Sequence, residues 1–348
     1  DYYCPKRMGL LDPATKDKRV AFFLPWMGKS LAGTTDTPQK IVSIDEEPVP
    51  KLDDIDYILD ELKDYVEVTP TRGEVKAAWA GIRPLVSPVG ADPSDTASIV
   101  RSHYIFMDPQ SKLVTVTGGK WTTYRRMAEE TVDFVVDNFS FKHAKECVTR
   151  KIGLIGSHGY DEHLNVKLQK LFKCDYDVAE HLARSYGDRA FNVLLIDYGK
   201  QYERLHPKHP FLLAEVKWAC REEMAETPED FFLRRIRLGF IDAVAAYDSL
   251  PVVCSIMAKE LKWTVTKEQE NLKKARKKME AMGYGLIRDS GVRNDQTFII
   301  ESFKESGYLG KQQANELLNK LGSDQRIEKD HISLMEFIDY VHRETGGK

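Results

Sequence analysis

Hydrophobic residues follow two different patterns in the first part of the chain. The dense apolar run "RVAFFLP", from Arg19 to Pro25, is typical of a buried strand, and "SLAGTTDTP" after it predicts the second strand of a hairpin. Apolar residues at helical spacing in "KLDDIDYILDELKDYVE" predict a helix over residues 51–67. The segment "VKAAWAGIRPLVSP" predicts a strand that is broken by Gly81 and Pro84.

Strand and helix patterns alternate once more before residue 140. "SIVRSHYIFMD" and "KLVTVTGG" predict two strands around the turn "DPQSK", and a helix is expected from about Thr122 to Asn138. Strands followed by a packed helix predict an α/β or α+β layered unit.

From about Val148 onward the pattern becomes helical. A strong helix start lies at Thr227, which is placed to act as an N-cap, with Pro228 at the first helical position and Asp230 at the third. We therefore expect an all-α domain over roughly residues 150–282. The glycine-rich "MGYGLIRDSGVRND" predicts a linker, and the tail after it predicts further helices. The predicted helical stretches are "HLNVKLQKLF", "DVAEHLARSYG", "RAFNVLLIDYG", "AEVKWACREEM", "TPEDFFLRRIRLGFIDAVAAYDSL", "VVCSIMAKEL", "TFIIESFKESG", "KQQANELLNKLG" and "SLMEFIDYVHRE".

Composition narrows the class of protein. The 348 residues are 42% hydrophobic and 30% charged with a net charge of -3, so no overall basic field indicates a nucleic-acid partner. Five scattered cysteines without a C-x-x-C pair predict reduced thiols and no structural zinc site. No stretch approaches the roughly 20 apolar residues that span a bilayer. The sequence begins without a methionine or signal peptide, and we expect a fragment or a processed form.

The junction "GGKWTTYR" is the first candidate for chemistry. Gly118 and Gly119 let a backbone approach a ligand closely, and Lys120 adds a positive charge at the start of a helix. The threonines, including Thr122, add hydroxyl donors and one N-cap. The spacing matches neither a Walker A loop nor G-x-G-x-x-G. A tight βα turn without a ligand explains the same residues, and the sequence leaves both interpretations open.

Arginines in apolar surroundings are the second candidate. Arg83 in "AWAGIRPLVSP" needs an anionic partner, which is either an internal carboxylate or the phosphate or carboxylate of a substrate. Arg101 in "SIVRSHY" raises the same question. The arginines of "RRIRLGF" are expected instead to pair with acids such as Glu222, Glu223 or Asp230.

The tail carries a calcium-loop spacing without calcium ligands. If Ile332 and Glu336 stand at positions 8 and 12 of an EF-hand loop, then Gln325, Ile327 and Lys329 fill positions 1, 3 and 5. Those positions need oxygen ligands, mostly carboxylates. We therefore expect no calcium at the 325–336 loop, and no other metal pattern appears in the chain.

Several stretches together resemble one family. "DYYCPKRMGLLDPATKDKRVAFFLPWMGKSLAGTTDTP", "AWAGIRPLVSP", "VTGGKWTTYRRMAEETVD", "AEVKWACREEMAETPEDFFLRRIRLGFID" and "IMAKELKW" are similar to FAD-dependent glycerol-3-phosphate dehydrogenase of the mitochondrial type, in that family's order. The resemblance covers nearly everything up to about residue 282. It implies the C-terminal part of an FAD/substrate-binding domain at 1–147, of mixed α/β fold. A helical C-terminal domain would follow at 148–282, with a linker and helical tail at 283–348. This tail stands where family members carry an EF-hand extension, here with its ligands lost.

The resemblance also implies the chemistry. Family members oxidise sn-glycerol 3-phosphate to dihydroxyacetone phosphate, pass the hydride to FAD and the electrons to ubiquinone, and lie at the mitochondrial inner membrane as peripheral or monotopic proteins. Gly118, Gly119, Lys120 and Thr122 resemble the motif that contacts the flavin. Arg83, with Arg101 and Lys120, resembles the set that binds substrate. The helical domain resembles a cap that contributes to a homodimer.

The start of the chain departs from the family. The G-x-G-x-x-G fingerprint and the proton acceptor of the family precede the residues that match, so the catalytic base is not among the residues named here. Without the unit that binds the pyrophosphate, we expect this chain alone to bind FAD poorly and to be inactive. Two alternatives stay open: a related flavin amine or amino-acid oxidase, and a non-catalytic truncated paralogue that acts as an interaction module.

Overall fold

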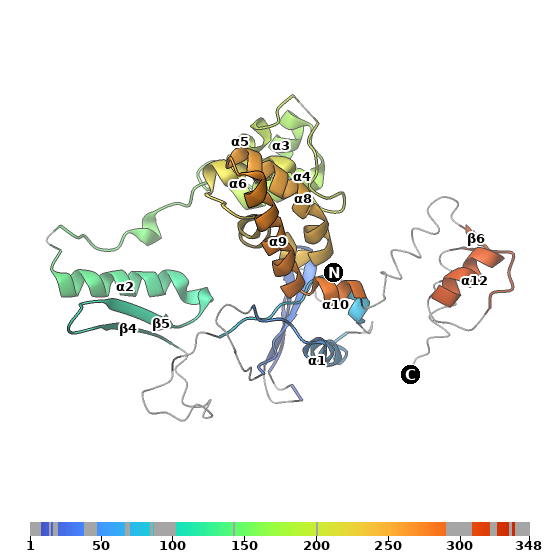
Figure 1. Ribbon diagram of the computed structural model, residues 1–348, viewed down its shortest axis with the longest axis horizontal. Coiled ribbons are helices and arrows are strands. Elements are labelled where there is room, and N and C mark those ends of the chain that lie inside the picture. Colours follow the sequence, from blue (N-terminus) through green and yellow to red (C-terminus); the bar gives the residue numbers. More distant parts are fainter. Residues whose placement is uncertain are drawn as a thin grey trace. The chain divides into compact units, whose positions relative to one another are not determined.

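The computed structural model describes the helices and strands of most of the chain (Figure 1). The described residues are 8–13, 15–16, 20–37, 47–66, 70–83, 86, 102–141, 143–199, 201–289, 308–320, 326–333 and 336–337. The chain divides into two compact units, one of Asp1–Ala80 with Tyr202–Lys348 and one of Gly81–Gln201.

The first unit begins with a small antiparallel sheet. Its strands are β1 (Leu10–Asp12), β2 (Ala21–Trp26) and β3 (Lys29–Gly33), in that order. The expected hairpin is confirmed, since β2 pairs with β3, whereas β1 was not predicted. Helix α1 (Leu52–Leu62) confirms the helix expected over 51–67, and its buried Leu62 packs with Phe23 in a small apolar cluster. Alternate residues of β2 are buried, as expected for a strand that covers a core with one face.

The segment after α1 corrects one expectation. A 3₁₀ turn covers Arg72–Glu74, and residues 75–83 form no strand. Two backbone bonds tie this extended segment to the ends of helices: Ala78 N–H donates to Met282 O at 3.1 Å, and Ala243 N–H donates to Lys76 O at 2.9 Å. Residues 75–78 are half-buried and residues 79–83 are exposed, and the backbone partners of the segment are not another strand.

The remaining helices of the first unit surround a large apolar core. Phe231, Phe232, Leu250 and Met279 are among its fully buried side chains. Helices α8 and α9 pack side by side along much of their length (Figure 1). The helices around this core are α6 (Leu213–Glu222), the π-helical η5 (Asp230–Arg235), α7 (Leu238–Ile241), α8 (Ala243–Glu260), α9 (Val265–Ala281) and α10 (Tyr284–Asp289).

The stretch expected as one long helix after Thr227 is divided in three. Arg237 adopts a left-handed backbone with φ 59°, and Asp242 is extended, so η5, α7 and α8 are separate. The predicted start is confirmed: the Asp230 carboxylate accepts the Thr227 N–H at 2.9 Å, and the helix begins at Pro228. Helix α10 lies inside the segment that was expected to be a linker.

The second unit opens with a hairpin and a helix that lies along it (Figure 1). Strands β4 (His103–Met107) and β5 (Val114–Gly118) pair antiparallel around the predicted turn, and α2 (Tyr124–Phe139) follows. Both strands and the helix were expected from the sequence. The remaining helical elements of this unit are η2 (Trp121–Thr123), η3 (Thr149–Lys151), α3 (Leu164–Phe172), α4 (Tyr176–Tyr186), η4 (Gly187–Arg189) and α5 (Ala190–Leu195).

The described part of the tail contains the short strands β6 and β7 and the helix α12. Strand β6 (Tyr308–Gly310) pairs with β7 (His331–Ser333), and α12 (Lys311–Lys320) confirms one predicted tail helix. The helix expected in "TFIIESFKESG" lies outside the described residues. Within the described part of the chain, no helix is long and apolar enough to cross a membrane. The four described cysteines, Cys147, Cys174, Cys220 and Cys254, are free thiols, as expected.

Candidate functional site

The glycine pair stands at the junction between β5 and α2. Gly118 is the last residue of β5 and lies opposite His103 of β4. Both glycines have a left-handed backbone, with φ 75° at Gly118 and 81° at Gly119. Residues that carry a Cβ rarely adopt this backbone conformation, so the turn itself requires glycine at both positions.

Close packing gives the glycines a second structural reason. A Cβ on Gly118 would lie 2.9 Å from Val86 Cγ2 and 3.0 Å from the backbone oxygen of Ser102. A Cβ on Gly119 would lie 2.7 Å from the sulfur of Met127 and 3.0 Å from His103 Cβ. The space beside these backbones is therefore filled by the chain itself, which favours the βα turn as the reason for the glycines.

The start of α2 differs from the predicted N-cap. Thr123 is the residue before the helix, but its side chain does not cap it. Its hydroxyl donates to Lys120 O at 3.0 Å and its N–H donates to the same oxygen at 2.9 Å. A 3₁₀ turn at Trp121–Thr123 therefore precedes α2, and it tightens the chain before the helix begins.

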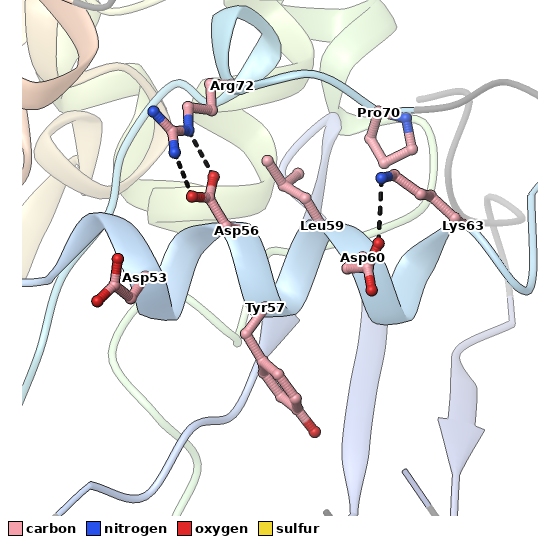
Figure 2. Close-up of a pocket in the computed structure, with 8 residues that line it drawn as sticks. All are labelled: Asp53, Asp56, Tyr57, Leu59, Asp60, Lys63, Pro70 and Arg72. Atoms are coloured by element: carbon pink, nitrogen blue, oxygen red, sulfur yellow. Dashed lines mark hydrogen bonds and ion pairs between the residues drawn. The ribbon is translucent and has the colours of Figure 1, made fainter. Parts of the chain in front are cut away.

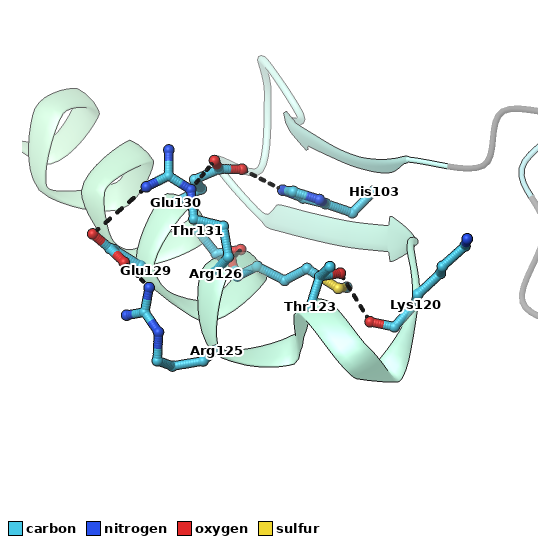
Figure 3. Close-up of polar contacts among 9 residues, drawn as sticks. His103, Lys120, Thr123, Arg125, Arg126, Glu129, Glu130 and Thr131 are labelled. Carbon is cyan, nitrogen blue, oxygen red and sulfur yellow. Dashed lines mark hydrogen bonds and ion pairs between the residues drawn. The ribbon is translucent and has the colours of Figure 1, made fainter. Parts of the chain in front are cut away.

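The side chains after the glycines are exposed. Trp121 is 88% exposed and Tyr124 is 64% exposed, and Lys120 and Thr122 are exposed as well. Figure 3 shows the Lys120 side chain extending away from the charged network on α2. Internal packing accounts for the glycines but not for a lysine, a tryptophan and a tyrosine that face solvent together. Together with Thr122 they form the solvent-exposed part of the junction.

A charged network fixes α2 against the hairpin (Figure 3). His103 Nε2 lies 2.6 Å from Glu130 Oε2, and Arg126 donates to the other oxygen of Glu130 at 2.5 Å. Arg125 donates to Glu129 at 2.5 Å. Hydrogen bonds from Arg126 and Arg125 hold the pKa of Glu130 and of Glu129 below the ordinary value. Both carboxylates therefore stay ionised, and Glu130 links strand β4 to helix α2 through His103.

The predicted substrate arginines are placed as follows. Arg83 is exposed at the end of the extended segment, in the same compact unit as Lys120. Arg101 lies outside the described residues. Two of the three arginines of "RRIRLGF" pair with acids as expected: Arg234 with Asp230 at 2.6 Å and Arg235 with Glu223 at 3.0 Å.

Two features of the junction were missed by sequence reasoning. Trp121 and Tyr124 belong to the motif "GGKWTTYR", and their nearness to Lys120 was a usable signal. The ion pair of His103 with Glu130 had no such signal, because a strand and a turn separate the two residues. Its existence depends on the register of β4 with β5.

A second polar feature lies in the first unit. His209 Nε2 donates to Asp242 Oδ2 at 3.0 Å, and Asp242 Oδ1 accepts the Ala245 N–H at 2.9 Å, which caps α8. Burial acts to raise the pKa of Asp242, but these hydrogen bonds and the charge of Lys76 together hold the pKa below its usual value. This pair joins the 204–209 loop to the start of α8, and the described contacts indicate a structural role.

An open surface depression lies beside α1 (Figure 2). Its carboxylates are mostly paired: Asp56 with Arg72, and Asp60 with Lys63 at 3.1 Å. The depression thus has little uncompensated charge and lies apart from the glycine junction in the sequence. Within the described residues, no group of three or more His, Cys, Asp or Glu is arranged to hold a metal ion.

The comparisons with known proteins define a class first. Residues 3–159 match the family "FAD dependent oxidoreductase", and residues 147–268 match the "C-terminal domain of alpha-glycerophosphate oxidase". The two matches meet at the boundary between the hairpin–helix part and the helical part of the chain. They define a flavin-dependent oxidoreductase with a helical C-terminal domain.

The relatives narrow this class. The chain is 44% identical over 285 residues to a probable mitochondrial glycerol-3-phosphate dehydrogenase of Caenorhabditis elegans, covering 79% of this chain and 38% of the relative. It is 42% identical over 296 residues to the mitochondrial enzyme of Homo sapiens, covering 81% of this chain and 39% of the relative. The chain therefore belongs to the family of FAD-dependent glycerol-3-phosphate dehydrogenases. It spans about two fifths of the length of these two relatives.

A solved structure agrees with this assignment. The glycerol-3-phosphate dehydrogenase of Bacillus halodurans, complexed with FAD, superposes with a TM-score of 0.61 at 28% identity. The superposition covers 79% of this chain and 54% of that one. The expected family and its mixed α/β and helical organisation are thus confirmed.

Proposed function

We propose that this chain takes part in the FAD-dependent oxidation of sn-glycerol 3-phosphate to dihydroxyacetone phosphate, with electrons passed on to a quinone. The observation that carries the proposal is the pair of contiguous family matches over residues 3–268, together with the solvent-facing Lys120 at the start of α2. Residues 1–147 would contribute to the FAD and substrate domain, and residues 148–282 would form the helical domain.

The glycine junction would hold the flavin. Bound FAD supplies a hydride acceptor for the alcohol carbon of the substrate. Lys120 brings a full positive charge, and the N-terminal end of α2 adds a partial one, so both favour an electron-rich ligand. Gly118 and Gly119 would hold the turn in shape, while Thr122 offers a hydroxyl at the exposed end. These residues fit the group, since the cation and the hydroxyl are exposed on the same short turn.

The substrate phosphate would be held by Arg83, Arg101 and Lys120. A guanidinium binds a phosphate through two parallel hydrogen bonds, and a lysine adds a point charge. The described part of this set, Arg83 and Lys120, belongs to one compact unit, and both side chains are exposed. We assign the general base to no residue of this chain.

A peripheral position at the mitochondrial inner membrane is part of the proposal. The relatives from Caenorhabditis elegans and Homo sapiens are mitochondrial proteins. On this chain, Leu154 is 80% exposed and Ile155 is 85% exposed, close in sequence to the exposed Arg150. Apolar side chains beside a cation suit the surface of an anionic membrane, where ubiquinone resides. We propose a homodimer through the helical domain by the same family argument.

Flavin binding tests the proposed role of Lys120. The purified chain is titrated with FAD and followed by flavin fluorescence and by thermal shift. We expect weak, saturable binding that falls about tenfold in Lys120→Met, the effect of losing one charge-assisted contact. The control is Lys145→Met, since Lys145 is an exposed lysine of the same unit outside the junction. Equal affinity in the two variants would contradict the placement of FAD at this turn.

Catalysis tests a second part of the proposal. We expect the chain by itself to show no glycerol-3-phosphate-dependent dye reduction, because family members contribute further residues to the pyrophosphate site. Dye reduction by the isolated chain would overturn that expectation. Reduction with an amino acid in place of glycerol 3-phosphate would favour the amine or amino-acid oxidase alternative.

We also propose that the tail is a degenerate pair of EF-hand loops. Leu309 and Ile332 lie opposite each other in the β6–β7 pair. Strand β6 leads directly into α12, and residues 336–337, shortly after β7, are helical. The two halves repeat one contact: Gly310 N–H donates to the Gln313 side chain at 3.2 Å, and Ser333 N–H donates to the Glu336 side chain at 3.0 Å. Gln313 and Glu336 would then stand at position 12 of their loops.

A further inference from the structure

An ion pair joins two residues of the second tail loop, Lys329 and Glu336, at positions where a calcium loop carries ligands. In a calcium loop the side chains at positions 5 and 12 both bind the ion. Here Lys329 stands at position 5, and its ammonium lies 2.5 Å from Oε1 of Glu336 at position 12. The other oxygen, Oε2, accepts the N–H and the hydroxyl of Ser333, each at 3.0 Å. Both oxygens of the carboxylate are thus already engaged.

The rest of the loop is held by contacts that need no metal. Ile327, at position 3, is buried at 3% exposure and supplies no oxygen ligand from its side chain. Its backbone is fixed by Asn315 of α12: Ile327 N–H donates to Asn315 Oδ1 at 2.7 Å, and Asn315 Nδ2 donates to Ile327 O at 2.9 Å. One asparagine thus anchors the loop to the neighbouring helix.

The first loop also lacks the anionic ligand of a calcium site. Gln313 stands where a bidentate glutamate is needed, and its amide oxygen accepts the Gly310 N–H. A neutral amide offers one oxygen and no charge. Each loop therefore lacks a ligand at a position that calcium requires.

We propose that the Lys329 ammonium takes the place of a metal ion beside Glu336, so that the tail folds without divalent metal and transmits no calcium signal. This inference rests on the proposed EF-hand pairing of the tail. The positive charge of Lys329 repels a divalent ion from the same carboxylate, while it satisfies the charge of Glu336. The pKa of Glu336 falls to about 2, chiefly through the Lys329 contact, and the carboxylate therefore stays ionised at neutral pH.

Hydrogen exchange of the whole chain tests the proposal. Peptides that cover β6, β7 and Ile327 are followed by mass spectrometry, once with excess calcium and once with a calcium chelator. We expect the same protection in both media. Slower exchange with calcium, or saturable calcium binding by calorimetry, would overturn the proposal.

Variants separate the effect of the Lys329 charge from the fold of the tail. Lys329→Met should speed exchange of the Ile327 and Ile332 amides several-fold in both media. Lys311→Met is the control, because Lys311 also makes an exposed ion pair in the tail, with Glu328, but does not contact the carboxylate at position 12. Equal exchange in the two variants would refute the role of Lys329.

A charge reversal gives the opposite signature. Lys329→Asp places two carboxylates together, so its exchange should be fastest in chelator and should slow when calcium is added. The same exchange in both media would contradict the electrostatic argument. Unprotected amides of Leu309 and Ile332 in the unchanged chain would refute the proposed pairing of the two loops. Protected amides whose exchange slows with calcium would instead refute the proposed role of Lys329.

Discussion

Alanine at the two junction glycines separates a structural turn from a ligand contact. A left-handed backbone costs an alanine about 1–2 kcal/mol, and overpacking a filled site costs about 1–3 kcal/mol more. At Gly118 the new methyl group would meet the Ser102 carbonyl at 3.0 Å, and a backbone atom cannot move aside cheaply. We therefore expect Gly118→Ala to lower the free energy of unfolding by about 2–5 kcal/mol.

Gly119→Ala should cost less, although its φ is similar. Its methyl group would meet the sulfur and terminal carbon of Met127 at 2.7 and 2.8 Å. A methionine side chain is flexible and can rotate away, so we expect a loss of about 1–3 kcal/mol. We expect this order because Gly118 meets a backbone oxygen, whereas Gly119 meets side-chain atoms only, the nearest from the flexible Met127 and the next from His103 Cβ at 3.0 Å.

Urea denaturation measures these losses, with exchange of the β4–β5 amides as the local readout. Gly81→Ala is the matched control: Gly81 lies in the same unit, has no neighbouring atom within 4 Å of an added Cβ, and does not need a positive φ. Its loss should be near zero. The reasoning would be refuted if Gly118→Ala lost no more stability than Gly81→Ala. Stability unchanged together with lower FAD affinity would instead place the glycines in the ligand contact.

Three further outcomes follow from the contacts of other groups. Asp242→Ala removes the cap on the Ala245 N–H and should destabilise the chain by about 1–2 kcal/mol in urea, while Asp242→Asn, which keeps a capping oxygen, should lose less. Glu336 has a folded pKa of about 2 against an ordinary value of 4.5. The stability that its ionised carboxylate contributes is therefore fully present above pH 4.5 and is lost as the pH falls towards 2. Amide exchange of the tail across this range should accelerate with acid, and Glu336→Gln should remove the dependence. Cys254, whose pKa burial raises to about 12, should resist a thiol reagent in the folded chain at neutral pH, whereas the exposed Cys147 should react.

The sequence predicted elements whose periodicity is local. The β2–β3 hairpin, the β4–β5 hairpin and α2 lie where the apolar pattern placed them, because each pattern reports which side of that element faces a core. The pairing of Arg234 and Arg235 with nearby acids was also readable, since the partners lie close in the sequence.

Features that depend on distant partners were not readable. Residues 75–83 carry the apolar content of a strand, but their backbone bonds to Met282 and Ala243 come from helix ends far along the chain. Helix breaks at Arg237 and Asp242 lie inside one continuous helical pattern, and nothing in the local sequence marks the left-handed backbone of an arginine. The capping role expected for a threonine failed at Thr123, because a 3₁₀ turn uses its hydroxyl at Lys120 O.

The junction combines two demands that the sequence alone could not separate. Backbone strain and filled space explain Gly118 and Gly119 without any ligand. Neither explains Trp121, which is 88% exposed although a tryptophan gains most from burial. Nor do they explain why Lys120 extends away from Glu129 and Glu130 (Figure 3). Selection for stability alone would favour a buried Trp121 ring and an ion-paired Lys120. The glycines are thus explained by the fold, whereas the exposed residues after them are not. We therefore expect substitutions at the glycines to change stability, and substitutions at the exposed residues to change flavin affinity.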